Sequence, residues 1–174
     1  MRSTVYPPRE DTFLLKHVVE ELDLEGKKVL EIGCGNGVVT SAMETGGAEI
    51  TAVDINENAL DQTREQLQNP EKHVLKNSDL FENIEGSFDY LFFNPPYLSD
   101  EPGVGDEEKW YAGDDNIVRK VLEQVDEYLN DEGELFMVLS DRTPELDELV
   151  GTFELEEIRE EKLWFEKLYV VRYK

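Results

Sequence analysis

The sequence has 174 residues, of which 41 are acidic and 17 basic, so its formal net charge is −24. A surface this negative repels phosphate backbones, because nucleic-acid affinity comes largely from lysine and arginine, and we therefore expect no direct binding to DNA or RNA. No apolar run is long enough to cross a membrane and residues 1–10 contain no signal-peptide core, which predicts a cytoplasmic protein without a membrane segment.

Cysteine and histidine, the residues of disulfides and of most zinc sites, are scarce in this chain. Cys34 is the only cysteine, and His17 and His73 are the only histidines, which excludes an internal disulfide and predicts no metal site. The length fits one domain over residues 1–174. Acidic residues are spread along the chain, and a salt-loving host is one hypothesis for them. Full folding and activity without added salt would contradict that hypothesis.

The first predicted element is a helix from about Arg9 to Leu22, whose apolar residues recur at helical spacing. Asp11 and Thr12 fall in its first turn. One interpretation is that this helix only covers a sheet face and that these two residues favour its start. The other is that the helix start, with free N–H groups and a hydroxyl, faces the carboxylate of a ligand. The sequence leaves both open.

A short buried strand, Lys27–Ile32, runs directly into a glycine loop, Gly33–Gly37, and then into a helix over Val38–Thr45. Glycines at alternate positions let the backbone turn tightly and approach a ligand closely. A dinucleotide fingerprint would need glycine at position 38, which is valine here. Glu31, two residues before the loop, instead gives the E-x-G-x-G-x-G form that is typical of S-adenosylmethionine (SAM) methyltransferases.

Acids follow the next two predicted strands. The strand Ala48–Val53 ends at Asp54, whose carboxylate suits the two hydroxyls of a ribose, although a strand-end acid facing solvent is the simpler alternative. A helix over Asn56–Leu67, with its first residue as N-cap, comes next. The brief strand His73–Lys76 precedes Asp79, which suits an adenine amino group but by itself is better explained as a turn or cap residue.

The strand Ser87–Phe93 stops at Asn94-Pro95-Pro96-Tyr97. Two prolines cannot continue a sheet ladder, and ligands of open α/β sheets bind beyond the carboxyl ends of the strands. The Asn94 side-chain oxygen and the Pro95 carbonyl would offer two acceptors to a planar –NH2 group, with Tyr97 as a stacking face. The alternative is an ordinary turn after a strand.

The rest of the chain continues an alternating pattern. We interpret residues 98–113 as a lid that carries Trp110 and Tyr111, or alternatively as a solvated connection. After them the pattern predicts an amphipathic helix, a buried strand, a short helix and a closing strand pair, over Asp114–Leu129, Glu134–Ser140, Thr143–Val150, Thr152–Ile158 and Leu163–Tyr173. Strands alternating with helices predict an α/β fold with a parallel sheet.

Together these motifs resemble the HemK-type glutamine N5-methyltransferases of translation release factors, in their short archaeal and eukaryotic form, among the class I SAM-dependent methyltransferases. The resemblance is carried by Tyr6-x-Pro8-x-Glu10-Asp11-Thr12-Phe13, Glu31-x-Gly33-x-Gly35-x-Gly37, Asp54, Asp79-Leu80-Phe81, Asn94-Pro95-Pro96-Tyr97 and Glu166-Lys167-Leu168. It implies a Rossmann-like α/β fold with a mostly parallel seven-stranded sheet, helices on both faces and an antiparallel C-terminal strand. Residues 110–116 match the family's pattern only in part.

The resemblance also implies SAM as cofactor and S-adenosylhomocysteine as product. Asp54 would hold the ribose, Asp79 and the Leu80 backbone the adenine, the glycine loop the methionine part and Thr12 its carboxylate. The full implied cofactor set is Tyr6, Asp11, Thr12, Glu31, Gly33, Cys34, Gly35, Gly37, Asp54, Ile55, Asp79, Leu80 and Asn94. The implied catalytic set, which would hold the acceptor amide, is Asn94, Pro95, Pro96 and Tyr97.

Partners follow from the same resemblance. It implies a class 1 release factor as substrate, methylated on a glutamine in a Gly-Gly-Gln loop, and a small zinc-binding activator protein. We expect the activator at the edge strand near His73–Lys76, because unpaired backbone groups invite strand addition. Three alternatives remain open: an N6-adenine methyltransferase that uses the same residues after base flipping, a protein lysine methyltransferase, for which no base is assigned, and a SAM-binding scaffold without catalysis.

Overall fold

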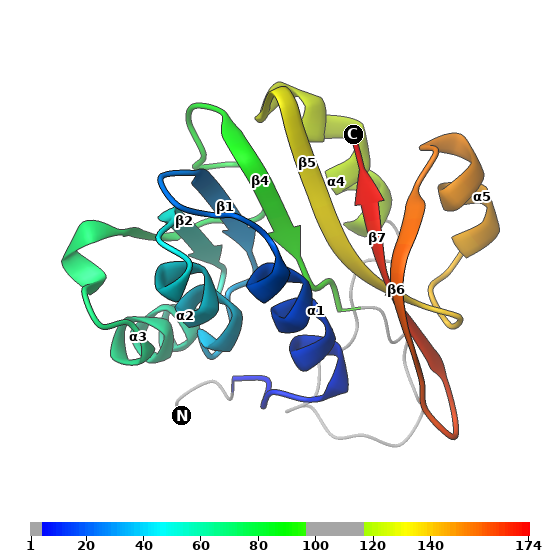
Figure 1. Cartoon of the computed structure of the whole chain (residues 1–174), viewed down its shortest axis with the longest axis horizontal. Coiled ribbons are helices and arrows are strands. Elements are labelled where there is room, and N and C mark those ends of the chain that lie inside the picture. The colour runs from blue at the N-terminus through cyan, green and yellow to red at the C-terminus, as the bar shows by residue number, and fades with distance from the viewer. Residues whose placement is uncertain (1–4, 97–116) are drawn as a thin grey trace.

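The computed structural model of this chain describes residues 5–96 and 117–174. A seven-stranded sheet in the order β3-β2-β1-β4-β5-β7-β6 forms its centre, and only β7 runs antiparallel to the other six strands (Figure 1). The strands are β1 Lys28–Ile32, β2 Glu49–Asp54, β3 Val74–Asn77, β4 Phe88–Phe93, β5 Leu129–Ser140, β6 Glu156–Lys162 and β7 Lys167–Tyr173. The predicted mostly parallel sheet with an antiparallel C-terminal strand is thereby confirmed.

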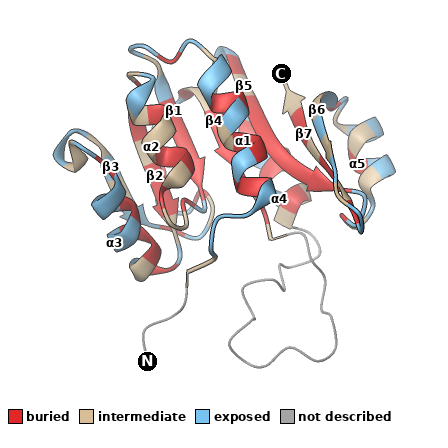
Figure 2. Ribbon diagram, turned by 60° about the horizontal axis from the view of Figure 1, so that its bottom comes forward, coloured by how far each residue is buried: buried red, intermediate tan, exposed pale blue. Residues whose placement is uncertain are grey.

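Helices cover both faces of this sheet. Their bounds are α1 Glu10–Glu21, α2 Val38–Thr45, α3 Glu57–Gln66, α4 Ile117–Gln124 and α5 Leu146–Thr152, with 3-10 turns η1 Pro70–Lys72 and η3 Val125–Glu127. Apolar residues of α1, α2 and α3 pack on one face, and those of α4 and α5 pack on the other. Figure 2 shows the buried sheet between these two layers.

The central strand β4 explains why both faces need cover. Successive side chains of a strand point to opposite faces. Phe92 belongs to the apolar cluster under α1, whereas Leu91 and Phe93 belong to the cluster under α4. The continuous apolar run in the sequence is therefore the signature of a strand that is buried on both sides, as parallel sheets require.

Most predicted elements agree with the observed ones within a few residues, which is the usual uncertainty of element ends. Asn56 caps α3 as predicted, since its side-chain oxygen accepts a hydrogen bond from the Asn58 N–H at 3.0 Å. β3 lies at one edge of the sheet, next to β2, which confirms the predicted edge strand.

The helix predicted to run to Leu129 is wrong at its C-terminal end. α4 ends at Gln124 and the 3-10 turn η3 follows it. The Tyr128 carbonyl accepts a hydrogen bond from the Phe88 N–H at 2.8 Å, and the Tyr128 ring stacks on Phe81 with centroids 4.3 Å apart. These contacts draw the chain into the sheet, so β5 begins at Leu129 and not at Glu134. Residues 114–116 lie outside the described part.

Candidate functional site

A cavity of about 240 Å³ lies at the carboxyl ends of β1, β2 and β4, beside the first turn of α1. Nearly all of the predicted site residues line it: Tyr6, Asp11, Thr12, Glu31, Gly33, Cys34, Gly35, Asp54, Ile55, Asp79, Leu80, Asn94, Pro95 and Pro96. Gly37 is not among the lining residues. Tyr97, together with Trp110 and Tyr111 of the expected lid, lies outside the described residues.

Several lining residues were not predicted as site residues, namely Val5, Ile32, Asn36, Val39, Asn56, Ala59, Ser78, Phe93 and Ile117. Asn36 is the most informative of them. Its side-chain oxygen accepts from the Val38 N–H at 3.2 Å, and its amide donates to the Tyr6 carbonyl at 3.3 Å. Asn36 thus ties the glycine loop to the N-terminal segment. Its position between two glycines was the only available signal.

Backbone hydrogen bonds fix the glycine loop against β2. The N–H groups of Gly33 and Cys34 both donate to the Val53 carbonyl, at 2.8 and 3.1 Å. The Gly35 N–H donates to Asp54 Oδ2 at 3.0 Å. The loop is therefore held in shape by the protein itself, which is the kind of preorganisation that a ligand-binding loop requires.

Gly37 acts through packing against α3. Its φ of +81° is left-handed, and a Cβ at this position would lie 2.6 Å from the Thr63 Cα. Thr63 also donates a hydrogen bond to the Gly35 carbonyl at 3.2 Å. Only glycine therefore lets the loop and α3 come this close. Gly37 does not line the cavity, so the predicted contact between Gly37 and the cofactor is not seen there.

The carboxylate of Asp54 accepts hydrogen bonds from two backbone N–H groups. Oδ1 accepts from the Asn56 N–H at 2.9 Å, and Oδ2 accepts from the Gly35 N–H. Burial raises the pKa of Asp54, and these N–H donors partly oppose that rise. Each carboxylate oxygen has further lone-pair capacity, so Asp54 can orient the loop and still accept from a ligand hydroxyl.

Asp79 and Leu80 form a tight turn at the cavity edge. Leu80 has a φ of +47°, and the Ser78 hydroxyl donates to the Leu80 carbonyl at 3.0 Å. Asn83 in turn donates its N–H to Ser78 Oγ at 3.0 Å. This turn gives the predicted pair a fixed position in the cavity lining, which also includes Ile55, a residue that is 63% exposed.

Glu31 is buried beside the glycine loop. Its side chain is only 4% exposed, and Oε2 accepts a hydrogen bond from the Thr40 hydroxyl. Burial raises the pKa of Glu31 to about 8, whereas the Thr40 hydrogen bond lowers it. Below that pH the folded protein holds Glu31 as a neutral acid.

This burial predicts a pH-dependent stability. Between pH 4.5 and about 8 the folded protein keeps a proton on Glu31 that the unfolded chain releases, so stability falls as pH rises through this window. The slope from this one group is at most about 1.4 kcal/mol per pH unit. Glu31→Gln keeps an oxygen that can accept the Thr40 hydrogen bond but removes the group that titrates. The free energy of unfolding of the ligand-free variant, measured with urea, should therefore depend less steeply on pH than that of the wild-type protein. Identical slopes in the two proteins would contradict this assignment.

The first turn of α1 is organised by Asp11. Its Oδ1 accepts from the Thr12 N–H at 2.7 Å, the Thr12 hydroxyl at 3.3 Å and the Tyr6 hydroxyl at 3.4 Å. These two Thr12 donors, which one interpretation of the sequence assigned to a ligand carboxylate, are thus directed to a carboxylate of the protein.

Asp11 also brings together two segments that are far apart in the sequence. Its Oδ2 accepts a hydrogen bond at 3.0 Å from Asn94 Nδ2, across a separation of 83 residues. The other end of that amide, Asn94 Oδ1, is buried and has no hydrogen-bond partner among residues 5–96 and 117–174. Since a buried acceptor without a partner is costly, this oxygen marks a place where a ligand donor fits.

No group of three or more potential metal ligands occurs among residues 5–96 and 117–174. Within the same ranges, no helix has the length and apolar character that a membrane crossing requires.

Residues 10–166 match the methyltransferase small domain family. A Methanocaldococcus jannaschii protein provisionally named protein N5-glutamine methyltransferase is 44% identical over 97 residues, covering 54% of this chain and 48% of that protein. Release factor glutamine methyltransferase of Streptococcus pneumoniae is 33% identical over 145 residues, covering 75% and 52%. The chain spans about half the length of these curated relatives.

A solved structure shares the fold along nearly the whole chain. The structure of the E. cuniculi Mtq2–Trm112 complex, described as responsible for methylation of the eRF1 translation termination factor, has a TM-score of 0.72 and 25% identity. The matched region covers 98% of this chain and 98% of that one. The likeness includes the sheet and therefore the edge at which the cavity lies.

Proposed function

Because this chain belongs to the methyltransferase small domain family, we propose that it transfers a methyl group from SAM to the side-chain amide nitrogen of a glutamine in a translation release factor. The observation that carries this proposal is the unpartnered Asn94 Oδ1, whose amide nitrogen is held by Asp11. Because the nitrogen is fixed, the oxygen is an acceptor of set orientation, which is what a planar –NH2 group requires.

The cavity residues fit SAM. A Cβ added at Gly33 would meet no atom within 4 Å, so a ligand can lie against this backbone. Asp54 would accept from the ribose hydroxyls, the Asp79–Leu80 turn would meet the adenine, and exposed Ile55 would be covered by its flat ring. When bound, SAM supplies an electrophilic methyl group on a sulfonium sulfur and remains as S-adenosylhomocysteine.

The residues that would hold the methyl-accepting amide need to align its nitrogen with the methyl group, and a general base would contribute little. The lone pair of an amide nitrogen is delocalised into its carbonyl, so positioning and suitably placed acceptors help most. Asn94 Oδ1 would accept one amide hydrogen, and the Pro95 carbonyl would offer a second acceptor on a stiff backbone. A lysine acceptor would first have to lose a proton, whereas Asp11, the carboxylate bonded to Asn94, already accepts from Thr12 and Tyr6.

Charge and relatives support a protein as the acceptor. A net charge of −24 repels nucleic acid. The S. pneumoniae relative acts, by its name, on a release factor, and the E. cuniculi complex on eRF1. We therefore place a class 1 release factor, through its Gly-Gly-Gln loop, ahead of a flipped adenine.

A small zinc-binding activator would join at the edge strand β3. Backbone groups on the outer side of an edge strand can pair with a strand from another chain. Val74 in β3 is 52% exposed, which leaves an apolar side chain for such a partner. The E. cuniculi structure is likewise a complex with a second protein, Trm112.

The test is a methyl-transfer assay with labelled SAM and the host's class 1 release factor, with and without the activator, followed by mass spectrometry of the product. We expect label on the glutamine of the Gly-Gly-Gln loop and a higher rate with the activator. Label only on nucleic acid, or SAM binding without any methyl transfer, would contradict the proposal. Full activity of the chain alone, with no gain from the activator, would refute the partner.

A further inference from the structure

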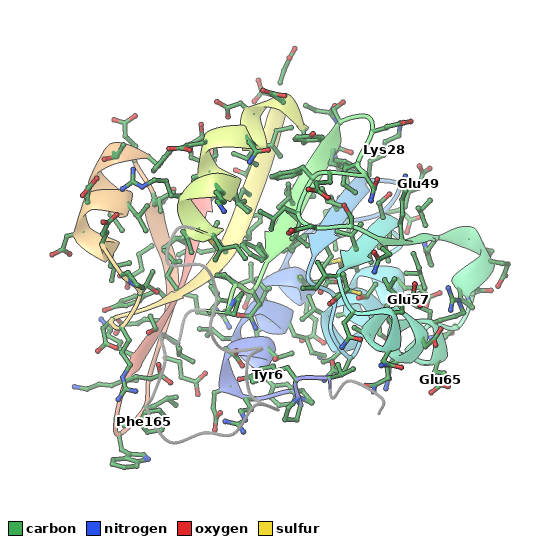
Figure 3. The ribbon with its side chains drawn as sticks, turned by 180° about the vertical axis from the view of Figure 1, so that it is seen from behind. Tyr6, Lys28, Glu49, Glu57, Glu65 and Phe165 are labelled. Carbon is green, nitrogen blue, oxygen red and sulfur yellow. The ribbon has the colours of Figure 1, made fainter. Side chains whose placement is uncertain are left out.

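A hairpin tip that carries two exposed aromatic residues lies along the edge of the molecule that also carries Tyr6 (Figure 3). It joins β6 to β7 and consists of Leu163, Trp164, Phe165 and Glu166. Trp164 is 93% exposed and Phe165 is 46% exposed, and their rings meet edge to face with centroids 5.1 Å apart. Figure 3 shows Phe165 along the same edge of the molecule as Tyr6 of the cavity. Paired exposed aromatics at such a position are typical of a contact surface.

The tip is fixed to the end of β5. Arg142 donates to the Phe165 carbonyl at 3.2 Å, and its guanidinium lies 5.6 Å from the centre of the Phe165 ring. The Lys167 N–H donates to Asp141 Oδ1 at 3.1 Å, and the Asp141 N–H donates to the Lys167 carbonyl at 3.0 Å. Since β5 is the neighbour of β4, whose end carries Asn94, the tip has a fixed position relative to the acceptor residues.

Glu166 adds an acceptor that the protein leaves unused. Its side chain is 9% exposed, and Oε2 is buried with no hydrogen-bond partner among the residues that the structure describes. Burial raises the pKa of Glu166; the charge of Arg142 and a hydrogen bond from Ser140 oppose this, and the charges of Asp141 and Asp11 add to it. Asp11 is the residue that holds Asn94. Two buried oxygens, Asn94 Oδ1 and Glu166 Oε2, thus have no hydrogen-bond partner in the described part of the chain, and Asp11 is hydrogen-bonded to the first residue and acts on the second through its charge.

We infer that the hairpin tip is a docking surface for the acceptor polypeptide, on which Trp164 and Phe165 pack against the chain that flanks the target glutamine while Glu166 Oε2 accepts one of its backbone N–H groups. This inference rests on the proposed function. A polypeptide fits better than a nucleic acid, because the charges of the acids Asp11 and Asp141 act on Glu166 and the guanidinium of Arg142 is already hydrogen-bonded to the Phe165 carbonyl. A glycine-rich loop, with its accessible backbone, could approach such an acceptor closely.

The first test is Trp164→Ala, with Trp164→Phe as the matched variant that keeps an aromatic ring. We expect Trp164→Ala to raise KM for the release factor about tenfold, as loss of an aromatic anchor commonly does, with kcat and SAM affinity unchanged. Trp164→Phe should recover most of the loss. Because Trp164 is exposed, the thermal midpoint of the free enzyme should not change. An unchanged KM in Trp164→Ala would overturn the inference.

The second test is Glu166→Gln, with Glu160→Gln on the same hairpin as control, since Glu160 is exposed and pairs with Lys167. The variant removes one of two acceptor oxygens together with a charge whose burial is unfavourable. We therefore expect release-factor affinity, measured calorimetrically with S-adenosylhomocysteine present, to fall about fivefold while the free enzyme becomes no less stable. A destabilised enzyme with unchanged affinity would make Glu166 structural and overturn its role. If wild-type enzyme leaves the release factor unmethylated, the proposed function fails instead.

Discussion

Asn94→Ala is expected to lower methyl transfer about a hundred- to a thousandfold, the range seen when one preorganised hydrogen-bonding group is removed from an active site. The reason is that Asn94 Oδ1 is the buried acceptor left free for the substrate amide. SAM affinity should stay nearly the same, because the glycine loop, Asp54 and the Asp79–Leu80 turn are untouched. Single-turnover rates together with calorimetric SAM titration measure the two effects separately.

Two further variants test how Asn94 is held. Asn94→Asp puts a carboxylate where Asn94 Nδ2 now lies 3.0 Å from Asp11 Oδ2, so like charges would face each other and activity should be lost as well. Asp11→Ala leaves the Asn94 amide unanchored, and kcat should fall while the amide itself is still present. Equal loss of SAM binding and of turnover in Asn94→Ala would count against the division between a cofactor side and an acceptor side.

Gly37→Ala is expected to destabilise the protein by about 3 kcal/mol, from left-handed backbone strain together with overpacking. The added Cβ would lie 2.6 Å from the Thr63 Cα, a backbone atom that cannot rotate away. Relief requires the loop or α3 to move, and the Thr63 hydrogen bond to the Gly35 carbonyl would then lengthen. Urea unfolding measures the stability loss, and SAM affinity should drop with it because the loop changes shape.

Gly26→Ala is the matched control. Gly26 also has a left-handed φ, +67°, but a Cβ there would meet no atom within 4 Å. Gly26→Ala should therefore lower the free energy of unfolding by about 1 kcal/mol, from backbone strain alone, and leave SAM affinity unchanged. If both variants lose the same stability, the contact with Thr63 contributes nothing and the role assigned to Gly37 is wrong.

Local signals were enough to predict most of the fold. The apolar run of β4 ends shortly before two prolines, and the glycine loop separates β1 from α2. Both boundaries could therefore be predicted from residues that are adjacent in the sequence. The end of α4 was not predictable in this way. Leu129 keeps helical spacing with Val125, and what ends the helix is pairing with Phe88, a residue of another strand. Long-range pairing overrode local periodicity.

In the candidate site, too, residues in local motifs were predictable, whereas contacts between distant segments were not. The glycine loop, Asp54, the Asp79–Leu80 turn and Asn94 were predicted because each belongs to a short motif at a strand end, and the structure places them around one cavity. The link between Asp11 and Asn94 spans 83 residues, so no pattern within one segment reports it. The unpartnered oxygen of Glu166 was equally hidden, since its surroundings come from β5 and α1.

The position of β7 between β5 and β6 has a consequence for how the molecule assembles. β6 comes first in the chain, yet it joins the sheet only through β7. β6 therefore has no place in the sheet until the strand that follows it has paired with β5. The parallel strands around the cofactor cavity do not depend on this step, whereas the aromatic tip and Glu166 take their positions only when it is complete. In the order of folding, the cofactor cavity together with Asn94 can form first, and the hairpin tip with Glu166 last.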